Sequence, residues 1–418
     1  MLKLNSVSAA ALLMFLLFAC TVPAGADTLG PALSYDELRS LAASARDGDV
    51  LLISGDFSAE GGEPLSSPAL LHITSDRGPR ATVRHLGLRD AAVSFSDVNL
   101  FDTLTIEGTS DVELLDGVTV TGSAGQSALV FSGSGSLLVN PGCEIIGGSN
   151  GDGIQIAHRG GDFYASLEGV VRGGDGSTGG AGVTVSPLQS YGTMMISGDV
   201  RGGDGTSIGG NALNLYDMSS NAFITVAGNV RGGRGPIGGD GIQIVSIQDN
   251  VSIGVSGTVS GGRGVRYGGD ALILMNASDG STVNLTGSFS GGDATDQVGE
   301  PGQSLLIVGQ TDLSHTRVVD CMLEDGKNTF AYNHKDDAVT PLPEITSSVD
   351  DVDPLATPSP TPIPAPTDSP VTEPTPSPTE TPTPLPTEAP TAAPSDTPPP
   401  EATAGEADAQ AMGEIALP

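Results

Sequence analysis

Hydrophobic and polar residues alternate over short segments in the middle of the chain, and these segments recur at a nearly fixed interval. Between residues 142 and 309 an Ile/Val/Leu-x-Gly segment returns every 29 or 30 residues. Such alternation places one set of side chains on each face of a β-strand. Short strands repeated at this period bury their apolar faces only when the repeats stack on one another. The recurring glycines are Gly169, Gly198, Gly228, Gly257 and Gly287.

Each repeat contains three alternating segments separated by Gly-Gly pairs. In one repeat the segments begin at Val200, Leu213 and Ile224. We therefore predict an all-β fold, a three-sided parallel β-helix (solenoid). Connections between parallel strands are almost always right-handed, so we expect a right-handed coil. The alternation continues less regularly upstream, and the predicted parallel β-helix covers residues 50–337.

A helix signature precedes the first strand of the repeat region. Ser34 and Glu37 have the spacing of a capping box, and Leu38 and Ala42 lie on one helical face. An uncapped solenoid would expose strand edges and core at its end. The sequence therefore predicts an N-terminal capping helix region over residues 27–49.

The start of the chain has the features of a targeting segment. A basic residue, an apolar run that is too short to span a bilayer, and small residues up to Ala26 predict a secretory signal peptide over residues 1–26. The segment ending at Cys20 also resembles a lipobox. Lipidation of Cys20 would make the protein a membrane-held lipoprotein, but the large Phe18 favours secretion over this alternative.

The end of the chain differs sharply in composition from the repeats. It holds most of the 30 prolines, set among Thr, Ser, Ala and Glu, and no Lys or Arg follows Lys335. Such a segment lacks the backbone donors and apolar bulk that a folded sheet needs. We predict a disordered Pro/Thr/Ser-rich tail over residues 338–418, extended by about 3.1 Å per residue. It resembles the wall-spanning linkers of Gram-positive surface proteins, which implies a secreted or extracellular, cell-wall-associated protein.

Charge and composition narrow the function classes. The 50 Asp and Glu residues against 17 Lys and Arg give a net charge of −33. Because nucleic acids repel so acidic a chain, we predict no nucleic-acid partner. The 59 glycines and the 4% aromatic content fit a turn-rich repetitive β structure.

A basic column follows from the repeat spacing. Arg172, Arg201 and Arg231 are 29 and 30 residues apart, and each stands before a Gly-Gly pair. Arg234 and Arg263 extend the positive stripe into the neighbouring turns. Guanidinium groups suit carboxylates and phosphates, so these five residues are candidates for binding an anionic polysaccharide.

The same column has a second interpretation. Asp175 and Asp204 follow Arg172 and Arg201 by three residues. Neutralised in this way, the arginines would form a compensated surface ladder that helps to set the register of the rungs. The acidic field of the whole chain also opposes the capture of an anion.

Acidic or polar residues open most of the alternating strands. Asp240 and Asp270 stand at equivalent positions of adjacent repeats, so a shared Ca²⁺ ion is a candidate. The alternative is that Asp and Asn serve the turn before the strand through side-chain to backbone hydrogen bonds. No other cofactor is predicted. This ladder consists of Asp152, Ala181, Asn211, Asp240 and Asp270.

The helix at Asp36-Glu37-Leu38, followed by an apolar strand ending at Ile53 and by stacked short strands, resembles the pectate-lyase-like (pectin-lyase-like) right-handed parallel β-helix superfamily. That superfamily contains secreted bacterial proteins. The resemblance covers about residues 34–334 and implies the β-helix fold. Hydrolases of the family carry Asn-Thr-Asp, Asp-Asp and Gly-His-Gly sets, and none of these occurs in a repeat of this chain.

Three functions stay open from the sequence. We favour a non-catalytic secreted or cell-surface β-helix protein that acts as an adhesin, scaffold or surface-presented binding face for a host or cell-surface protein. Outward small polar residues such as Gln155 and Asn214 support this interpretation. The alternatives are binding of an acidic polysaccharide through the arginines, and its degradation by lyase or hydrolase chemistry. No catalytic residues are assigned.

Overall fold

The structure of the protein is a computed structural model. The predicted signal peptide up to residue 25, with Cys20, and the predicted tail lie outside the described residues. Within the described part of the chain, no helix is long and apolar enough to cross a membrane. The described residues are 26–308, 316–318 and 322–323, without 77–78, 159, 190, 249 and 278–280.

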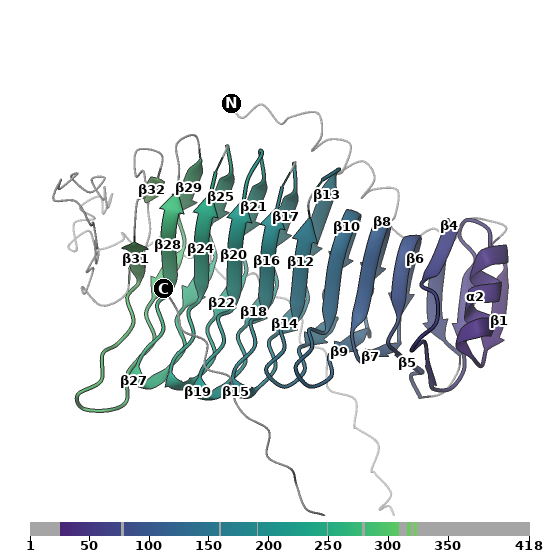
Figure 1. Cartoon of the computed structure of the whole chain (residues 1–418), viewed down its shortest axis with the longest axis horizontal. Helices are drawn as coiled ribbons and strands as arrows, with labels where there is room; N and C mark the ends of the chain where they lie inside the picture. The colour runs from purple at the N-terminus through teal and green to yellow at the C-terminus, as the bar shows by residue number, and fades with distance from the viewer. Residues whose placement is uncertain are drawn as a thin grey trace, which may run out of the picture. The chain divides into compact units, whose positions relative to one another are not determined.

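The described chain is a parallel β-solenoid, as predicted (Figure 1). Its strands form hydrogen-bonded sheets of 18, 11 and 4 members. The first ladder of the largest sheet begins at β4 and continues to β31. Its strands are β4 (Leu65–Ser75), β6 (Gly87–Ser96), β8 (Leu104–Leu114), β10 (Leu129–Val139), β12 (Ile154–His158), β16 (Val183–Leu188), β20 (Leu213–Met218), β24 (Ile242–Ile247), β28 (Leu272–Ala277) and β31 (Leu305–Val308).

The largest sheet divides into two ladders at β10. Residues 129–131 of β10 pair with β12, whereas residues 135–139 pair with β13. From β4 to β10 one long strand per rung serves both ladders. The second ladder begins with β1 (Thr28–Ala32) and β2 (Val50–Ile53), which pair with the second half of β4. Beyond β10 it consists of β13 (Phe163–Leu167), β17 (Thr193–Ile196), β21 (Phe223–Val226), β25 (Ser252–Val255), β29 (Thr282–Leu285) and β32 (Thr316–Val318).

The second sheet contributes one short strand to each rung. Its strands are β3 (Phe57–Ser58), β5 (Thr82–Arg84), β7 (Asn99–Phe101), β9 (Thr119–Thr121), β11 (Glu144–Ile146), β14 (Val170–Arg172), β18 (Asp199–Arg201), β22 (Asn229–Arg231), β26 (Thr258–Ser260), β30 (Ser288–Ser290) and β33 (Met322–Leu323).

A third sheet occurs in the regular rungs only and adds a strand that the sequence analysis did not predict. These rungs therefore contain four strands rather than the three expected from the alternating pattern. The additional strands are β15 (Gly176–Thr178), β19 (Gly205–Ile208), β23 (Gly235–Ile237) and β27 (Gly264–Tyr267).

The predicted helix is present as α2 (Tyr35–Ser44), beside β1 at the N-terminal end of the stack (Figure 1). The Ser34 side chain accepts a hydrogen bond from the Glu37 N–H at 3.3 Å. Leu38 and Ala42 are fully buried, as their helical spacing predicts. Strand β1 precedes the helix and pairs in parallel with β2, so the region 27–49 holds a strand as well as a helix.

Stacked apolar side chains fill the interior of the solenoid. In the second sheet, one column of equivalent residues is exposed by 1% or less in each of five successive rungs. Each such side chain stabilises the fold by roughly 1.5–3 kcal/mol through burial. This column contains Val171, Val200, Val230, Val259 and Phe289.

Candidate binding surface

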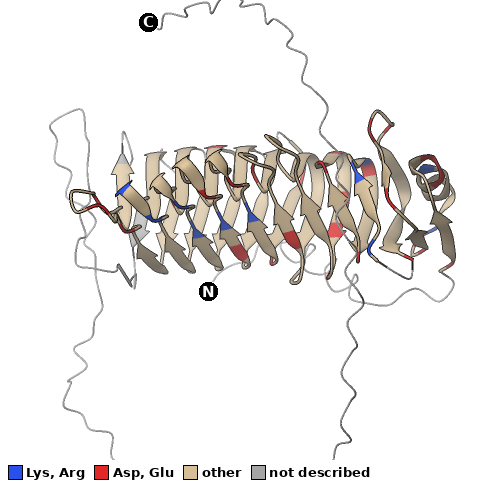
Figure 2. Cartoon of the chain, turned by 90° about the horizontal axis from the view of Figure 1, so that it is seen from below, with Lys and Arg blue, Asp and Glu red and all other residues tan. Residues whose placement is uncertain are grey.

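The structure stacks the predicted arginines in one column. Arg172, Arg201 and Arg231 are register partners at the ends of β14, β18 and β22. Their side chains leave the second sheet on the outer side of the solenoid, since the preceding valines point into the core. Figure 2 shows Arg positions in successive rungs of this region.

Salt bridges neutralise two arginines of the column. One of these salt bridges is the predicted one, and the other uses a different aspartate. Arg172 forms the expected salt bridge with Asp175. Arg201 pairs with Asp199 rather than with Asp204. Asp199 lies two residues before Arg201 on the same strand, so both side chains point to the same face. Asp204 instead accepts the backbone N–H of Arg234 in the next rung, at 2.8 Å.

Hydrogen bonds stabilise the ionised form of Asp175. Its second carboxylate oxygen accepts the N–H of Asp204 at 2.7 Å. Burial raises the pKa of Asp175, but the hydrogen bonds from Arg172 and Asp204 outweigh this effect and lower the pKa overall. Asp175 therefore remains a permanent counter-charge for Arg172.

The other candidate arginines have no such partner. Among the described residues, the guanidinium groups of Arg231, Arg234 and Arg263 form no salt bridge, and neither does that of Arg266. All four belong to two neighbouring rungs around β23 and β27. The column itself ends at Arg231, whose register partner in the next rung is Ser260, so Arg234 and Arg263 do not extend it as the sequence predicted. They lie in the adjacent loops, where Arg234 follows Asp204 in the stack.

Beside the arginines the third sheet forms a projecting row of loops, here called the ridge (residues 174–180, 203–210, 233–239 and 262–269). The two glycines that bound each loop are hydrogen-bonded to each other, with N–H to carbonyl oxygen distances of 2.8–2.9 Å. The ridge runs along the lower edge of the view in Figure 1, through β15, β19 and β27.

The base of the ridge has no room for side chains. A Cβ atom on Gly210 would lie 2.0 Å from the carbonyl oxygen of Gly180 in the preceding rung, and one on Gly239 would lie 2.0 Å from that of Gly210. Real Cβ atoms do not approach backbone oxygens so closely. The Gly-Gly pairs of the repeat are thus required by the close approach of one rung to the next.

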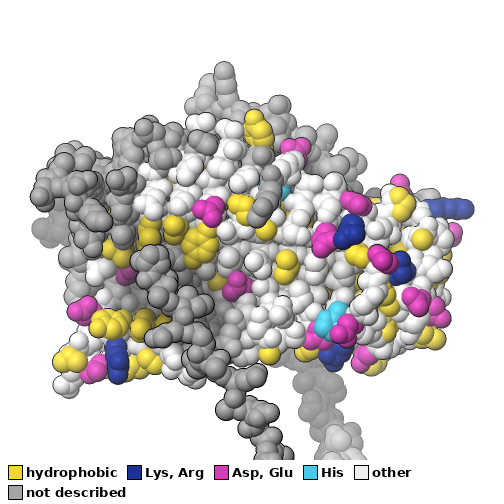
Figure 3. Space-filling model, viewed as in Figure 1, with side chains coloured by type: hydrophobic (Ala, Val, Ile, Leu, Met, Phe, Trp, Pro, Cys, Tyr) yellow, Lys and Arg dark blue, Asp and Glu magenta, His cyan; other side chains and the backbone are white. Residues whose placement is uncertain are grey.

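One side of the ridge carries exposed apolar side chains. Ile208, Ile237 and Tyr267 are register partners in three adjacent loops. They are 42%, 39% and 49% exposed, and neighbouring Val265 is 49% exposed. Figure 3 shows apolar side chains gathered with a basic one in the region of β27, at the lower left. The sequence analysis missed this column, although its members are also 29 and 30 residues apart.

The acidic ladder forms side-chain to backbone hydrogen bonds, as the alternative interpretation predicts, but they reach the next rung rather than the turn of the same rung. Asp152 accepts the N–H of Ala181 at 2.8 Å, Asn211 that of Asp240 at 2.8 Å, and Asp240 that of Asp270 at 2.9 Å. Each side chain thus holds the backbone of the following rung. Ala181 has no side-chain acceptor, so the ladder is interrupted there.

The predicted calcium site has two adjacent carboxylates, Asp240 and Asp270, each with one oxygen already bonded to a backbone N–H. Burial raises the pKa of Asp240 to about 6, with a further contribution from the Asp270 carboxylate. Burial also raises the pKa of Asp270. Among the described residues, no group of three or more His, Cys, Asp or Glu side chains is arranged to hold a metal ion. Calcium binding stays a prediction.

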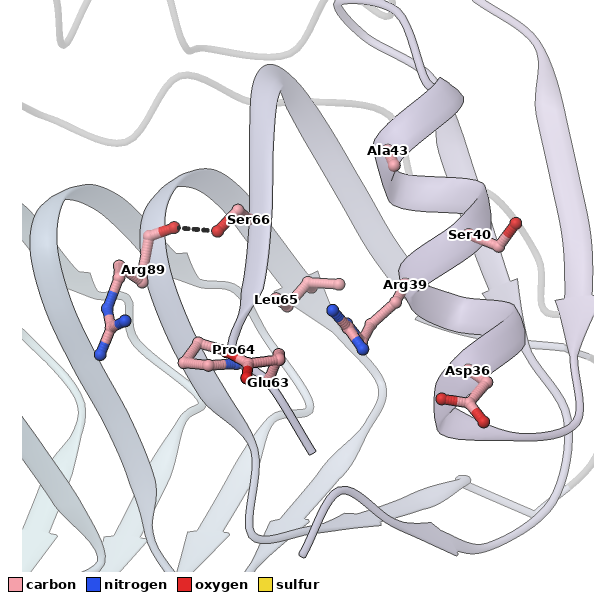
Figure 4. A pocket seen from close by; sticks show the side chains of 9 residues that line it. All are labelled: Asp36, Arg39, Ser40, Ala43, Glu63, Pro64, Leu65, Ser66 and Arg89. Atoms are coloured by element: carbon pink, nitrogen blue, oxygen red, sulfur yellow. Dashed lines mark hydrogen bonds between the residues drawn. The ribbon is translucent and has the colours of Figure 1, made fainter. Parts of the chain in front are cut away.

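A hollow of about 500 Å³ lies at the N-terminal end of the solenoid, between α2 and the strands β4 and β6 (Figure 4). Arg39 lines it from the helix and Arg89 from β6, and Asp36 and Glu63 lie beside them. Arg89 is already paired with Glu107 in the next strand. Because acidic and basic side chains are mixed around it, the hollow favours neither an anion nor a cation.

We found no protein-family model, curated protein or solved structure that matches this chain. The candidate binding surface is therefore inferred from the geometry of the solenoid.

Proposed function

We propose that this protein is a non-catalytic secreted or cell-surface β-solenoid that acts as an adhesin or scaffold by presenting a binding face. The observation that carries the proposal is the group of uncompensated arginines next to the exposed apolar column of the ridge. Exposed apolar surface beside uncompensated charge is typical of an interaction surface rather than of inert surface.

The regular stacking of the rungs supports a scaffold role. The outward residues Gln155, Thr184, Asn214 and Gln243 are register partners in four successive rungs. Side-chain hydrogen bonds connect some of them, such as that from Asn214 to Thr184 at 3.5 Å. Such a face repeats its chemistry at the strand spacing of about 4.8 Å, which suits an extended partner.

An acidic polysaccharide is the second candidate partner, favoured by the charge of Arg231, Arg234 and Arg263. Guanidinium groups that lack a carboxylate partner bind carboxylate or sulfate groups of a polymer without first breaking a salt bridge. The neutralised Arg172 and Arg201 would contribute less. Degradation of such a polymer is kept as the alternative activity.

The proposal also includes the hand and superfamily of the fold and the location of the protein. We infer a right-handed, three-sided β-helix of the pectate-lyase-like superfamily, with α2 as its N-terminal cap. Secretion through residues 1–26 and a spacer over residues 338–418 would place the solenoid outside the cell. The burial of Leu38 and Ala42 against the end of the stack supports the capping role of α2.

The full chain, immobilised, should be tested against polygalacturonate, a sulfated polysaccharide and neutral dextran, with and without Ca²⁺. We expect retention of the anionic polymers, weakened by added salt because the contacts are ionic. The triple variant R231Q/R234Q/R263Q should lose retention. The control R172Q, whose guanidinium is already paired with Asp175, should keep most of it.

New reducing or unsaturated ends on the polymer would identify an enzyme and contradict the non-catalytic proposal. Equal retention by the triple variant and by wild type would show that the arginines are not the binding residues. If no polymer is retained, the polysaccharide candidate is wrong, and the adhesin role then depends on a protein partner captured by the same arginines.

A further inference from the structure

We propose that the ridge is also a self-association surface, on which two copies of this chain pack ridge against ridge with their solenoid axes antiparallel. The twofold axis would lie between loop 203–210 and loop 233–239. Such an axis places each loop opposite the loop that is equally far on the other side of this point. Three features of the ridge are self-complementary about this one point.

The first feature is a column of charges. The residue that follows the first glycine of each loop stacks on its equivalent in the next rung. The hydrogen bonds from the N–H of Gly176 to the carbonyl oxygen of Asp204 and from the N–H of Gly205 to that of Arg234 show this register. Along the ridge the column reads Asp175, Asp204, Arg234 and Arg263. An antiparallel partner sets Asp204 opposite Arg234 and Asp175 opposite Arg263. Both pairs are of opposite charge, and the twofold axis forms each of them twice.

The second feature is the apolar column on the other side of the same loops. Its members are Thr178, Ile208, Ile237 and Tyr267, again in register. The same axis sets Ile208 opposite Ile237 and Thr178 opposite Tyr267. A twofold axis parallel to the solenoid would instead set the charged column of one copy against the apolar column of the other. Antiparallel packing alone matches both columns.

The third feature is the length of the two loops that flank the ridge. Beyond the ridge, the loop between Gly148 and Gly151 is the shortest of this series and the loop between Gly292 and Gly302 is the longest. The proposed axis places the long loop of one copy over the short loop of the other. The first positions of these loops, Ser149 and Asp293, then meet without two acidic groups facing each other.

The size of the contact predicts a weak dimer. Four strands at about 4.8 Å give a ridge about 19 Å long, so the buried area stays well below the roughly 1,000 Å² of a stable interface. We expect dissociation constants on the order of 0.1–1 mM. A high density of copies on one surface would raise the effective concentration into that range.

The test is sedimentation velocity of the full chain from about 10 µM to about 1 mM. Wild type should form dimers at the upper end. The variant R234D/R263D makes the column wholly acidic and D175R/D204R makes it wholly basic, so each should remain monomeric. An equimolar mixture of the two variants should dimerise again, because every opposed pair is then of opposite charge.

A second pair of variants tests the apolar column. It leaves unchanged the Asp175 and Asp204 side chains, which accept backbone N–H groups of the next rung. Ile237→Ser should weaken dimerisation at least several-fold. Val170→Ser changes a residue that is also 39% exposed but lies in the second sheet, away from the ridge, and should leave dimerisation unchanged. Circular dichroism melts establish that each variant is folded.

A wild-type chain that is monomeric up to about 1 mM would overturn the proposal. So would a dimer that persists in R234D/R263D or in Ile237→Ser, because another surface would then be responsible. Retention of polygalacturonate through Arg234 and Arg263 by a strictly monomeric protein would assign the ridge to the anionic polymer instead.

Discussion

The carboxylate of Asp240 accepts a hydrogen bond of 2.9 Å from the backbone N–H of Asp270, its equivalent in the next rung. Asn211 accepts the N–H of Asp240 in the same way at 2.8 Å. An amide oxygen and a carboxylate oxygen therefore serve the same structural purpose in this ladder. They differ in charge, and the charge is costly here because burial raises the pKa of Asp240 to about 6.

The substitution Asp240→Asn should stabilise the protein at alkaline pH. The folded pKa of about 6 lies above the ordinary value of 3.8. The folded protein therefore holds the Asp240 proton more tightly than the unfolded chain does. This contribution to the free energy of unfolding is complete below pH 4 and is lost as the pH rises through 6, where the buried carboxyl group ionises. We expect D240N to raise the free energy of unfolding by roughly 2–3 kcal/mol at pH 8 and to change it little at pH 4.

Urea denaturation at both pH values measures this difference. The reciprocal control is Asn211→Asp, which adds a carboxylate to the same ladder and should lower stability at pH 8. An effect of D240N that is the same at pH 4 and at pH 8 would show that ionisation of Asp240 is not its cause.

The glycines at the base of the ridge should tolerate no side chain. A Cβ on Gly239 would overlap the carbonyl oxygen of Gly210 at 2.0 Å. We expect Gly239→Ala to cost more than about 3 kcal/mol, because two backbone segments must separate. In Gly254→Ala the new methyl group meets nothing within 4 Å, so this control should stay within about 1 kcal/mol of wild type. Equal losses in thermal denaturation would contradict the close approach of the rungs.

The thiol of Cys143 should be unreactive in the folded protein. Its side chain is 2% exposed, and burial raises its pKa to about 11. The thiolate is the reactive form, so alkylation by iodoacetamide at pH 8 should be far slower than for a free thiol and should become rapid in urea. A background with Cys20→Ser and Cys321→Ser isolates the signal in mass spectrometry, because the chain has three cysteines. Rapid alkylation without denaturant would show that Cys143 is not buried.

The period of the repeat predicted much of the architecture. Spacings of 29 and 30 residues were sufficient to place Arg172, Arg201 and Arg231 in one column, because equivalent residues of stacked rungs lie side by side. The capping sequence at Ser34 and Glu37 likewise predicted where α2 begins. These features depend on local sequence and on repetition, which a single chain displays directly.

What the sequence analysis missed depends on backbone contacts between rungs. Strand β15 reads Gly-Ser-Thr and has no apolar alternation, so only its hydrogen bonds to the next rung make it a strand. Strand β1 contains Gly30 and Pro31, which ordinarily argue against a strand. The pairing of Arg201 with Asp199 was missed because the Asp three residues later was favoured over the one two residues earlier on the same face.

Successive repeats stack in parallel and in register, and a disulfide closure experiment tests this stacking most directly. Thr184 and Asn214 are partners in adjacent rungs, and Gln243 follows in the rung after that. Adjacent strands are about 4.8 Å apart, within disulfide range, whereas positions two strands apart are about 9.6 Å apart. We predict that T184C/N214C closes an intramolecular disulfide under mild oxidation and that T184C/Q243C does not. Closure of the second pair, or equal failure of both in a folded protein, would contradict the register of the solenoid.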